Sequence, residues 1–338
     1  MRALFFCRLV GFGFWLATLS CALAQPFRLP TANSAIFKPG AEERFFAATP
    51  GNIWTSGSFG CVRNNGWKIH EGLDIRSLQA DKRGEPTDPV SATADGEVVY
   101  LNTRAGLSSF GNYLIVRHQL EGLEIYSFYA HLSRIEPGVK VGLRVKSGQV
   151  LATMGRTSSV TTIGKDRAHV HFELNLLVND RFSAWFKKNC PGERNDHGDW
   201  NGQNFIGLDP RLILLEEQKL GAKFSLLDFI RRQTELCRVV VRATSFPWLR
   251  RYPQLVRHNP VAEKEGIAGY EIALNFNALP FELIPRAASE LKSKAAVQLL
   301  SVNAAEQQKN PARRLVIESR GHWTLTDHGL RAVGLVIY

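Results

Sequence analysis

Four residues of this chain have the types and the spacing of a metal-binding site: His70, Asp74, His169 and His171. They lie in two short segments, 70–74 (HEGLD) and 169–171 (HVH), about a hundred residues apart. A His and an Asp separated by three residues can bind the same ion, and a later His completes a set of three ligands. A catalytic zinc site has three protein ligands of these types and leaves its fourth position to water. The two segments therefore predict a metal-dependent hydrolase.

The second segment has the pattern of a β-strand. Because side chains alternate between the two faces of a strand, His169 and His171 share one face, while Val170 and Phe172 share the other. Both imidazoles could bind metal, or one could bind metal while the other acts on a substrate. A lone His-x-His pair is equally typical of a plain polar strand face, but its pairing with the 70–74 segment favours a metal site.

The remaining histidines carry weaker signals. His131 follows a strand-like stretch, where a single His is usually structural. We expect a structural or surface role for His118 and a solvated loop position for His197, although the surroundings of His197 resemble a ligand site in composition. The others, His258, His322 and His328, are assigned no role.

The segment from Ile53 to about Pro210 has the pattern of an antiparallel sheet or sandwich. Stretches such as 96–101, 112–117 and 123–129 are short, are rich in β-branched and aromatic residues, and are bounded by glycine turns. Two polar stretches, 79–88 and 187–205, interrupt this rhythm, and we expect both to be loops.

A smaller α+β domain is predicted for residues 216–338. Apolar residues at helical spacing predict one or two helices over 212–233, and the Ala/Leu-rich stretch 287–300 predicts another. Strand-like runs occur at 237–241, 268–274, 314–317 and 332–337. This region could bind a wall polymer, bind a partner protein, or cover the active site.

The first 24 residues have the features of a secretory signal peptide. A basic start is followed by an apolar run that ends in Ala22-Leu23-Ala24. The alternative is an uncleaved membrane anchor, although the run is short for a spanning helix, which needs about 20 residues. Residues 25–52 would then form an N-terminal extension. We expect an exported protein, periplasmic or extracellular, in the cell envelope.

Charge and cysteine content agree with export. The formal charge is +11, and +9 without Arg2 and Arg8 of the leader, which suits an anionic polymer such as a cell wall. Nucleic acid is the other usual partner of such a charge, but export argues against it. Outside the leader there are three cysteines: Cys61, Cys190 and Cys237. An oxidising compartment allows one intramolecular pair, and we expect Cys61 with Cys190; the alternative is three reduced thiols.

Several further motifs occur in order between about residues 53 and 215, and together they resemble the lysostaphin/LytM-type zinc metallopeptidase family. The matching elements are Phe59-Gly60, His70-x-Gly72-x-Asp74-Ile75, Pro89-Val90-x-Ala92, Asp95-Gly96-x-Val98, Gly111-Asn112-Tyr113-x-Ile115-x-x-His118, Tyr129-Ala130-His131-Leu132, Gly138-x-x-Val141, Gly148, His169-x-His171-Phe172-Glu173 and Asp209-Pro210.

The resemblance implies a site, a fold and an activity. His70, Asp74 and His171 would hold one Zn²⁺, and His131 and His169 would stand beside it as catalytic histidines. The fold would be an antiparallel β structure with a groove, and the activity would be hydrolysis of peptide bonds in peptidoglycan stem peptides or cross-links. The alternative is a non-catalytic relative that binds the wall or activates an amidase. An envelope protein could be a partner of the C-terminal domain. The loops 79–88 and 187–205 depart from the family pattern and would shape the groove.

Overall fold

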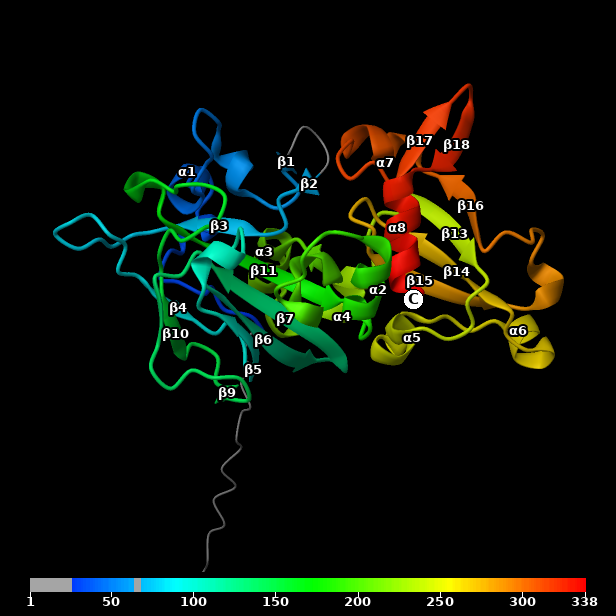
Figure 1. The fold of residues 1–338 in the computed structure, drawn as a ribbon, viewed down its shortest axis with the longest axis horizontal. Helices are drawn as coiled ribbons and strands as arrows, with labels where there is room; N and C mark the ends of the chain where they lie inside the picture. Colours follow the sequence, from blue (N-terminus) through cyan, green and yellow to red (C-terminus); the bar gives the residue numbers. More distant parts are fainter. Residues whose placement is uncertain (1–25, 64–67) are drawn as a thin grey trace, which may run out of the picture.

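The computed structural model describes residues 26–63 and 68–338. Figure 1 shows two halves side by side: residues up to about 220, in blue to green, and the remainder, in yellow to red. The predicted signal peptide lies outside the described residues. Among the helices that the structure describes, none is long and apolar enough to cross a bilayer.

The N-terminal half is built on a seven-stranded antiparallel sheet, which confirms the predicted mainly β fold. In spatial order its strands are β12 (Phe205–Leu208), β11 (His169–Leu177), β7 (Leu123–Ala130), β6 (Tyr113–Leu120), β5 (Gly96–Asn102) and β9 (Arg144–Val145), with β3 (Leu73–Arg76) paired to the start of β11. A three-stranded sheet and a short hairpin complete it: β4 (Pro89–Ser91), β10 (Val150–Thr153), β8 (Arg134–Ile135), and β1 (Val62–Arg63) with β2 (Lys68–Ile69).

Both faces of the large sheet are covered. All nine residues of β11 are buried. On one face, alternate residues such as Val170, Phe172 and Leu174 belong to the main apolar core. The opposite face carries a separate, largely aromatic cluster that includes Tyr113 and Phe128. The histidines of β11 lie on this second face, because they alternate with the core residues.

The N-terminal extension is part of this half. It contains α1 (Glu42–Phe45), and its Phe27, Phe45 and Phe46 are fully buried in the main core. The backbone N–H of Phe27 donates to the carboxylate of Glu217 at 2.9 Å. The extension therefore contributes side chains to the core of this half.

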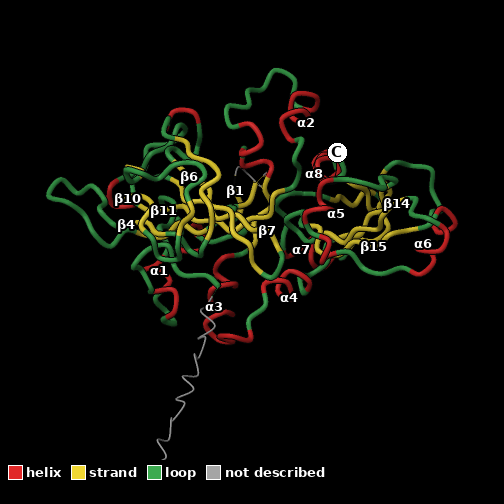
Figure 2. Tube along the Cα trace, turned by 90° about the horizontal axis from the view of Figure 1, so that it is seen from below, coloured by secondary structure: helices red, strands yellow, loops and turns green. Residues whose placement is uncertain are grey.

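The C-terminal half has the predicted α+β composition. Its sheet has the order β15 (Pro280–Arg286), β14 (Gly269–Leu274), β13 (Cys237–Val241) and β16 (Val297–Val302). A hairpin is formed by β17 (Val316–Ser319) and β18 (His322–Leu325). The helices from residue 210 onward are α3 (Pro210–Leu220), α4 (Leu226–Arg231), α5 (Pro247–Arg251), α6 (Pro260–Glu265), α7 (Ala304–Lys309) and α8 (Asp327–Val336). Figure 2 shows α3 and α4 on one side of the molecule and α2 (Phe182–Asn189) on the other.

Three local predictions are wrong. The stretch 287–300 is a single 3₁₀ turn followed by strand β16, because pairing with β13 outweighs the helical preference of Ala and Leu. The run 332–337 lies mostly in helix α8, which Thr326 caps by accepting the N–H of Gly329. The polar stretch 187–205 begins inside α2 and continues through two 3₁₀ turns.

The proposed disulfide is also wrong. Cys61, Cys190 and Cys237 are all free thiols. The Cys190 sulfur instead accepts a hydrogen bond of 2.7 Å from the guanidinium of Arg331 on α8. This contact joins the two halves, whereas the expected disulfide would have lain within the N-terminal half.

The two halves share one continuous core. The largest cluster of buried apolar side chains includes Val178 and Phe182 of the first half and Trp248 and Leu279 of the second. At the seam, the Tyr252 hydroxyl accepts the N–H of Leu177 at 2.9 Å. The boundary at residue 215 stays a prediction, because this core crosses it.

Candidate metal centre

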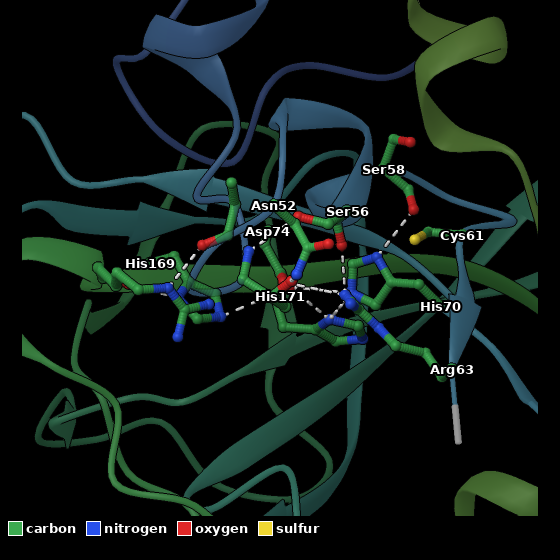
Figure 3. Close-up of polar contacts among 12 residues, drawn as sticks. Asn52, Ser56, Ser58, Cys61, Arg63, His70, Asp74, His169 and His171 are labelled. Atoms are coloured by element: carbon green, nitrogen blue, oxygen red, sulfur yellow. Dashed lines mark hydrogen bonds and ion pairs between the residues drawn. The ribbon is translucent and has the colours of Figure 1, made fainter. Parts of the chain in front are cut away.

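Three strands or strand ends bring the predicted ligands together. His70 directly follows β2, Asp74 lies in β3, and His171 lies in β11 directly opposite Asp74 in the sheet register. Asp74 Oδ1 is 3.0 Å from His70 Nε2 and 2.9 Å from His171 Nδ1. The two nitrogens are 3.0 Å apart. Figure 3 shows the three side chains pointing toward one another.

The glycine of the HEGLD segment makes this approach possible. A Cβ on Gly72 would lie 2.3 Å from the carbonyl oxygen of Phe172 in β11. Such a distance is far below van der Waals contact, and the obstructing atom is backbone. Only glycine therefore lets β3 pair with β11 in the register that places Asp74 against His171.

Hydrogen bonds orient the lone pairs of both imidazoles toward the same point. His70 Nδ1 donates to the carbonyl of Ser58 at 2.9 Å, and His171 Nε2 donates to Glu173 Oε1 at 2.6 Å. In the neutral tautomers that these bonds select, His70 Nε2 and His171 Nδ1 are unprotonated. Two imidazole lone pairs and a carboxylate oxygen then face one another, which is unfavourable without a cation between them.

The electrostatics of the cluster show the same need for positive charge. Burial would raise the pKa of Asp74, but His70, His169 and His171 together hold it well below its usual range. Burial would lower the pKa of His171, yet its hydrogen bonds to Asp74 and Glu173 raise it to about 10. The direction of this shift shows that the position favours positive charge, and two nitrogens and one oxygen are a donor set that fits zinc.

Glu173 and Asn175 extend the site along β11. Glu173 Oε2 accepts from Asn175 Nδ2 at 2.7 Å, and both side chains are buried. His169, His171, Glu173 and Asn175 are alternate residues and so share one face of the strand. Because alternate residues of a strand share a face, the sequence could have indicated Glu173 as the residue that orients His171. No sequence signal could have indicated the Ser58 carbonyl.

His131 and His169 lie next to the cluster. His169 Nε2 is 3.5 Å from Asp74 Oδ1, and its Nδ1 is 2.6 Å from the carbonyl of Arg167. His131 directly follows β7 in a left-handed conformation with φ 61°, and its Nδ1 bonds the carbonyl of Thr157 at 2.7 Å. The two rings are 4.9 Å apart. Burial lowers the pKa of both, that of His131 to about 3, so both are neutral bases.

Two residues that the sequence did not indicate also reach the site. The Phe110 ring stacks on His171, with centroids 5.5 Å apart and planes at 30°. A guanidinium nitrogen of Arg63 is 3.8 Å from Asp74 Oδ2, the oxygen directed away from the histidines, and Arg63 also bonds the Ser56 carbonyl. Figure 3 shows Arg63 beside His70.

The other histidines lie outside the cluster. His118 is buried, with its Nδ1 donating to the carbonyl of Asp95 and its Nε2 2.7 Å from Ser127 Oγ. His197 is half-buried rather than solvated: it accepts the Tyr100 hydroxyl and donates to the carbonyl of Leu107. Within residues 26–63 and 68–338, only the set of His70, Asp74 and His171 is arranged to hold a metal.

Comparison with known proteins finds a family match over the segment that carries the site. Residues 68–182 match the model of Peptidase family M23, and this segment contains all five predicted site residues. No curated protein matches the sequence.

Among solved structures, several peptidases are similar to part of the chain. The catalytic domain of lysostaphin from Staphylococcus simulans is 26% identical, with 35% of this chain and 75% of that chain covered and a TM-score of 0.26. A zinc-containing peptidase from Vibrio cholerae is 28% identical, with 40% and 37% covered and a TM-score of 0.27. The catalytic domain of the M23 protein EnpA from Enterococcus faecalis is 23% identical, with 33% and 74% covered and a TM-score of 0.25.

Proposed function

We propose that this protein is a zinc-dependent endopeptidase acting on peptidoglycan, because residues 68–182 match the model of peptidase family M23. The bonds hydrolysed are peptide bonds of the stem peptides or cross-links. The observation that carries the proposal is the convergence of two imidazole nitrogens and one carboxylate oxygen, with His131 and His169 beside them. A site that only bound wall material would not need these two further histidines.

The chain's own residues supply ligands and proton transfer. His70, Asp74 and His171 hold the ion, which when bound lowers the pKa of a water molecule from about 15.7 to about 7 and polarises the scissile carbonyl. Because Nδ1 of His131 and of His169 bonds a backbone carbonyl, each neutral ring presents Nε2 as a base. Either histidine can accept the proton of the attacking water at Nε2 and then, as the imidazolium, stabilise the oxyanion or deliver that proton to the leaving amine.

We place this activity in the cell envelope. The net charge of +9 outside the predicted leader attracts an anionic wall polymer. The apolar start of the chain supports export to the periplasm or the extracellular face. Peptidoglycan is the partner proposed, and an envelope protein could bind the C-terminal half.

The direct test uses the chain without residues 1–24 and purified sacculi of known cross-link chemistry. Zinc content is measured, and released products are identified by mass spectrometry. We expect one zinc per chain and release of muropeptides that stops on chelation and returns with zinc. A folded, zinc-loaded protein that releases nothing from any sacculus would refute the enzymatic proposal.

Substitutions separate the proposed roles. His70→Ala, Asp74→Ala and His171→Ala should lose zinc and activity together, because each removes a ligand. His131→Ala and His169→Ala should retain zinc and lose turnover by about 10²–10⁴-fold, the usual contribution of a general acid or base. Full activity in His131→Ala would remove that residue from the mechanism.

A further inference from the structure

The loop between β14 and β15, residues 275–279, is braced internally. The Asn275 side-chain oxygen accepts the N–H groups of Asn277 and Leu279 at 2.9 and 3.0 Å. The backbone carbonyl of Asn275 accepts the N–H of Ala278, which is held at φ 64°. Asn275 and Asn277 are both buried. These bonds fix the direction in which Phe276 and Asn277 leave the C-terminal sheet.

That direction is toward the N-terminal half. Asn277 Nδ2 donates to the carbonyl of Gly207 in β12 at 2.9 Å, and the Asn277 carbonyl accepts from Arg313 at 3.1 Å. The Phe276 ring packs edge-on against Phe59, with centroids 6.4 Å apart and planes at 70°. The loop thus contacts both β12 and the segment 58–60.

Segment 58–60 is the support of His70. The Ser58 carbonyl accepts His70 Nδ1, and the Gly60 N–H donates to the His70 carbonyl at 2.9 Å. The fit between this segment and β12 is close: a Cβ on Gly207 would lie 3.0 Å both from the Phe59 ring and from the Glu71 carbonyl oxygen. A shift of Phe59 or of β12 would therefore displace the backbone on both sides of His70.

We propose that Phe276 and Asn277 are positioning residues for the metal site, acting through Phe59 and Ser58 on His70. The inference rests on the zinc site of the proposed function. The C-terminal half thereby has a role in metal affinity that is separate from any binding of wall or partner. Loss of the hydrogen-bond partner that orients a metal-binding imidazole typically weakens metal affinity about 10–100-fold. Phe276 and Asn277 would act on that partner, the Ser58 carbonyl, by holding segment 58–60 in place.

The test measures zinc affinity by competition with a chelator in the full protein. Phe276→Ala and Asn277→Ala should each weaken zinc binding about tenfold or more. Phe276→Leu, which retains bulk against Phe59, should recover most of the loss and remains usable if the alanine variant does not fold. Far-ultraviolet circular dichroism shows that each variant is folded.

Tyr252→Phe is the matched control. It removes a hydroxyl that bonds Leu177 and Glu124 across the same seam, but neither partner belongs to the metal cluster or to segment 58–60. It should lower stability and leave zinc affinity unchanged. If folded Phe276→Ala and Asn277→Ala bind zinc as tightly as the wild type, this inference is wrong while the proposed function stands. The same holds if Tyr252→Phe loses as much zinc affinity as they do. Absence of zinc binding by the wild-type protein would instead refute the proposed function.

Discussion

In the proposed zinc site, each imidazole has one nitrogen bound to a fixed acceptor, and this bond would determine which nitrogen faces the ion. For His70 the acceptor is a neutral carbonyl, and for His171 it is the charged carboxylate of Glu173. A carboxylate makes the imidazole a stronger electron donor than a carbonyl does. We therefore expect the two histidines to contribute unequally to zinc affinity.

Glu173→Gln tests this difference. The amide oxygen can still accept from His171, so the geometry is kept while the negative charge is removed. We expect zinc affinity to fall about 10–100-fold, measured by chelator competition. Glu97→Gln is the control, because Glu97 is a partly exposed carboxylate paired with Arg117. Equal zinc affinities in the two variants would show that the charge of Glu173 has no effect.

His118 makes stability depend on pH away from the metal site. Burial lowers its pKa from 6.5 to about 4, so between these values the unfolded chain binds a proton that the folded chain does not. The contribution of neutral His118 to the free energy of unfolding is complete above pH 6.5. It is lost as the pH falls toward 4, by at most about 1.4 kcal/mol per pH unit.

Denaturant unfolding of wild type and His118→Gln at several pH values measures this contribution. The difference in unfolding free energy between the two proteins should change in favour of the variant as the pH falls from 6.5 to 4. Two curves that remain parallel over this range would show that His118 does not titrate as described.

At the level of single residues, the sequence predicted the side chains that gather at the site but not what holds them. The types and spacing of His70, Asp74 and His171 were informative because few side chains bind zinc. The Ser58 carbonyl carries no signal, since every residue has one. Phe276 and Asn277 could not be foreseen, because their contacts depend on how two distant segments pack.

At the level of secondary structure, the site depends on the pairing of β3 with β11. β3 contributes Asp74, β11 contributes His169 and His171, and Gly72 allows the strands to approach. This explains in steric terms why a glycine stands between the His and the Asp of the HEGLD segment.

Gly72→Ala should separate the two strands. The added Cβ meets a backbone oxygen, which cannot rotate away, so we expect a loss of about 1–3 kcal/mol in unfolding free energy and a clear loss of zinc affinity. Gly106→Ala is the control, because nothing lies within 4 Å of its Cβ position. Unchanged zinc affinity in Gly72→Ala would show that the register tolerates the methyl group.

Elements with strong local patterns were predicted well. The stretches 96–101, 112–117 and 123–129 correspond to β5, β6 and β7 within a few residues. Helix α8 was missed because Val333, Val336 and Ile337 favour strands in isolation, while burial of Val333 and Val336 stabilises them in a helix. Strand β16 was missed because its partner β13 lies far away in the sequence.

At the level of the whole molecule, the two halves are joined by one core. Their apolar side chains form a single cluster, and Arg251 of α5 pairs with both Glu124 and Asp180 across the seam. Sequence could suggest two domains from the change of texture near residue 210. It could not show that their cores merge.

We therefore expect one cooperative unfolding transition. Differential scanning calorimetry of the protein should give a single peak whose calorimetric and van't Hoff enthalpies agree. Residues 25–215 expressed alone should be unfolded or aggregated, because removing the second half exposes the apolar seam. Two resolved peaks, or a folded fragment 25–215, would contradict a shared core.

The backbone at His131 has a consequence for engineering. A side chain other than glycine held at φ 61° carries a conformational penalty of about 1–3 kcal/mol. Glycine would relieve it and lose the imidazole, so folding and chemistry make opposite demands at this position. A programme that raised the thermal stability of this protein by placing glycine at strained positions would, at His131, remove a residue of the proposed reaction.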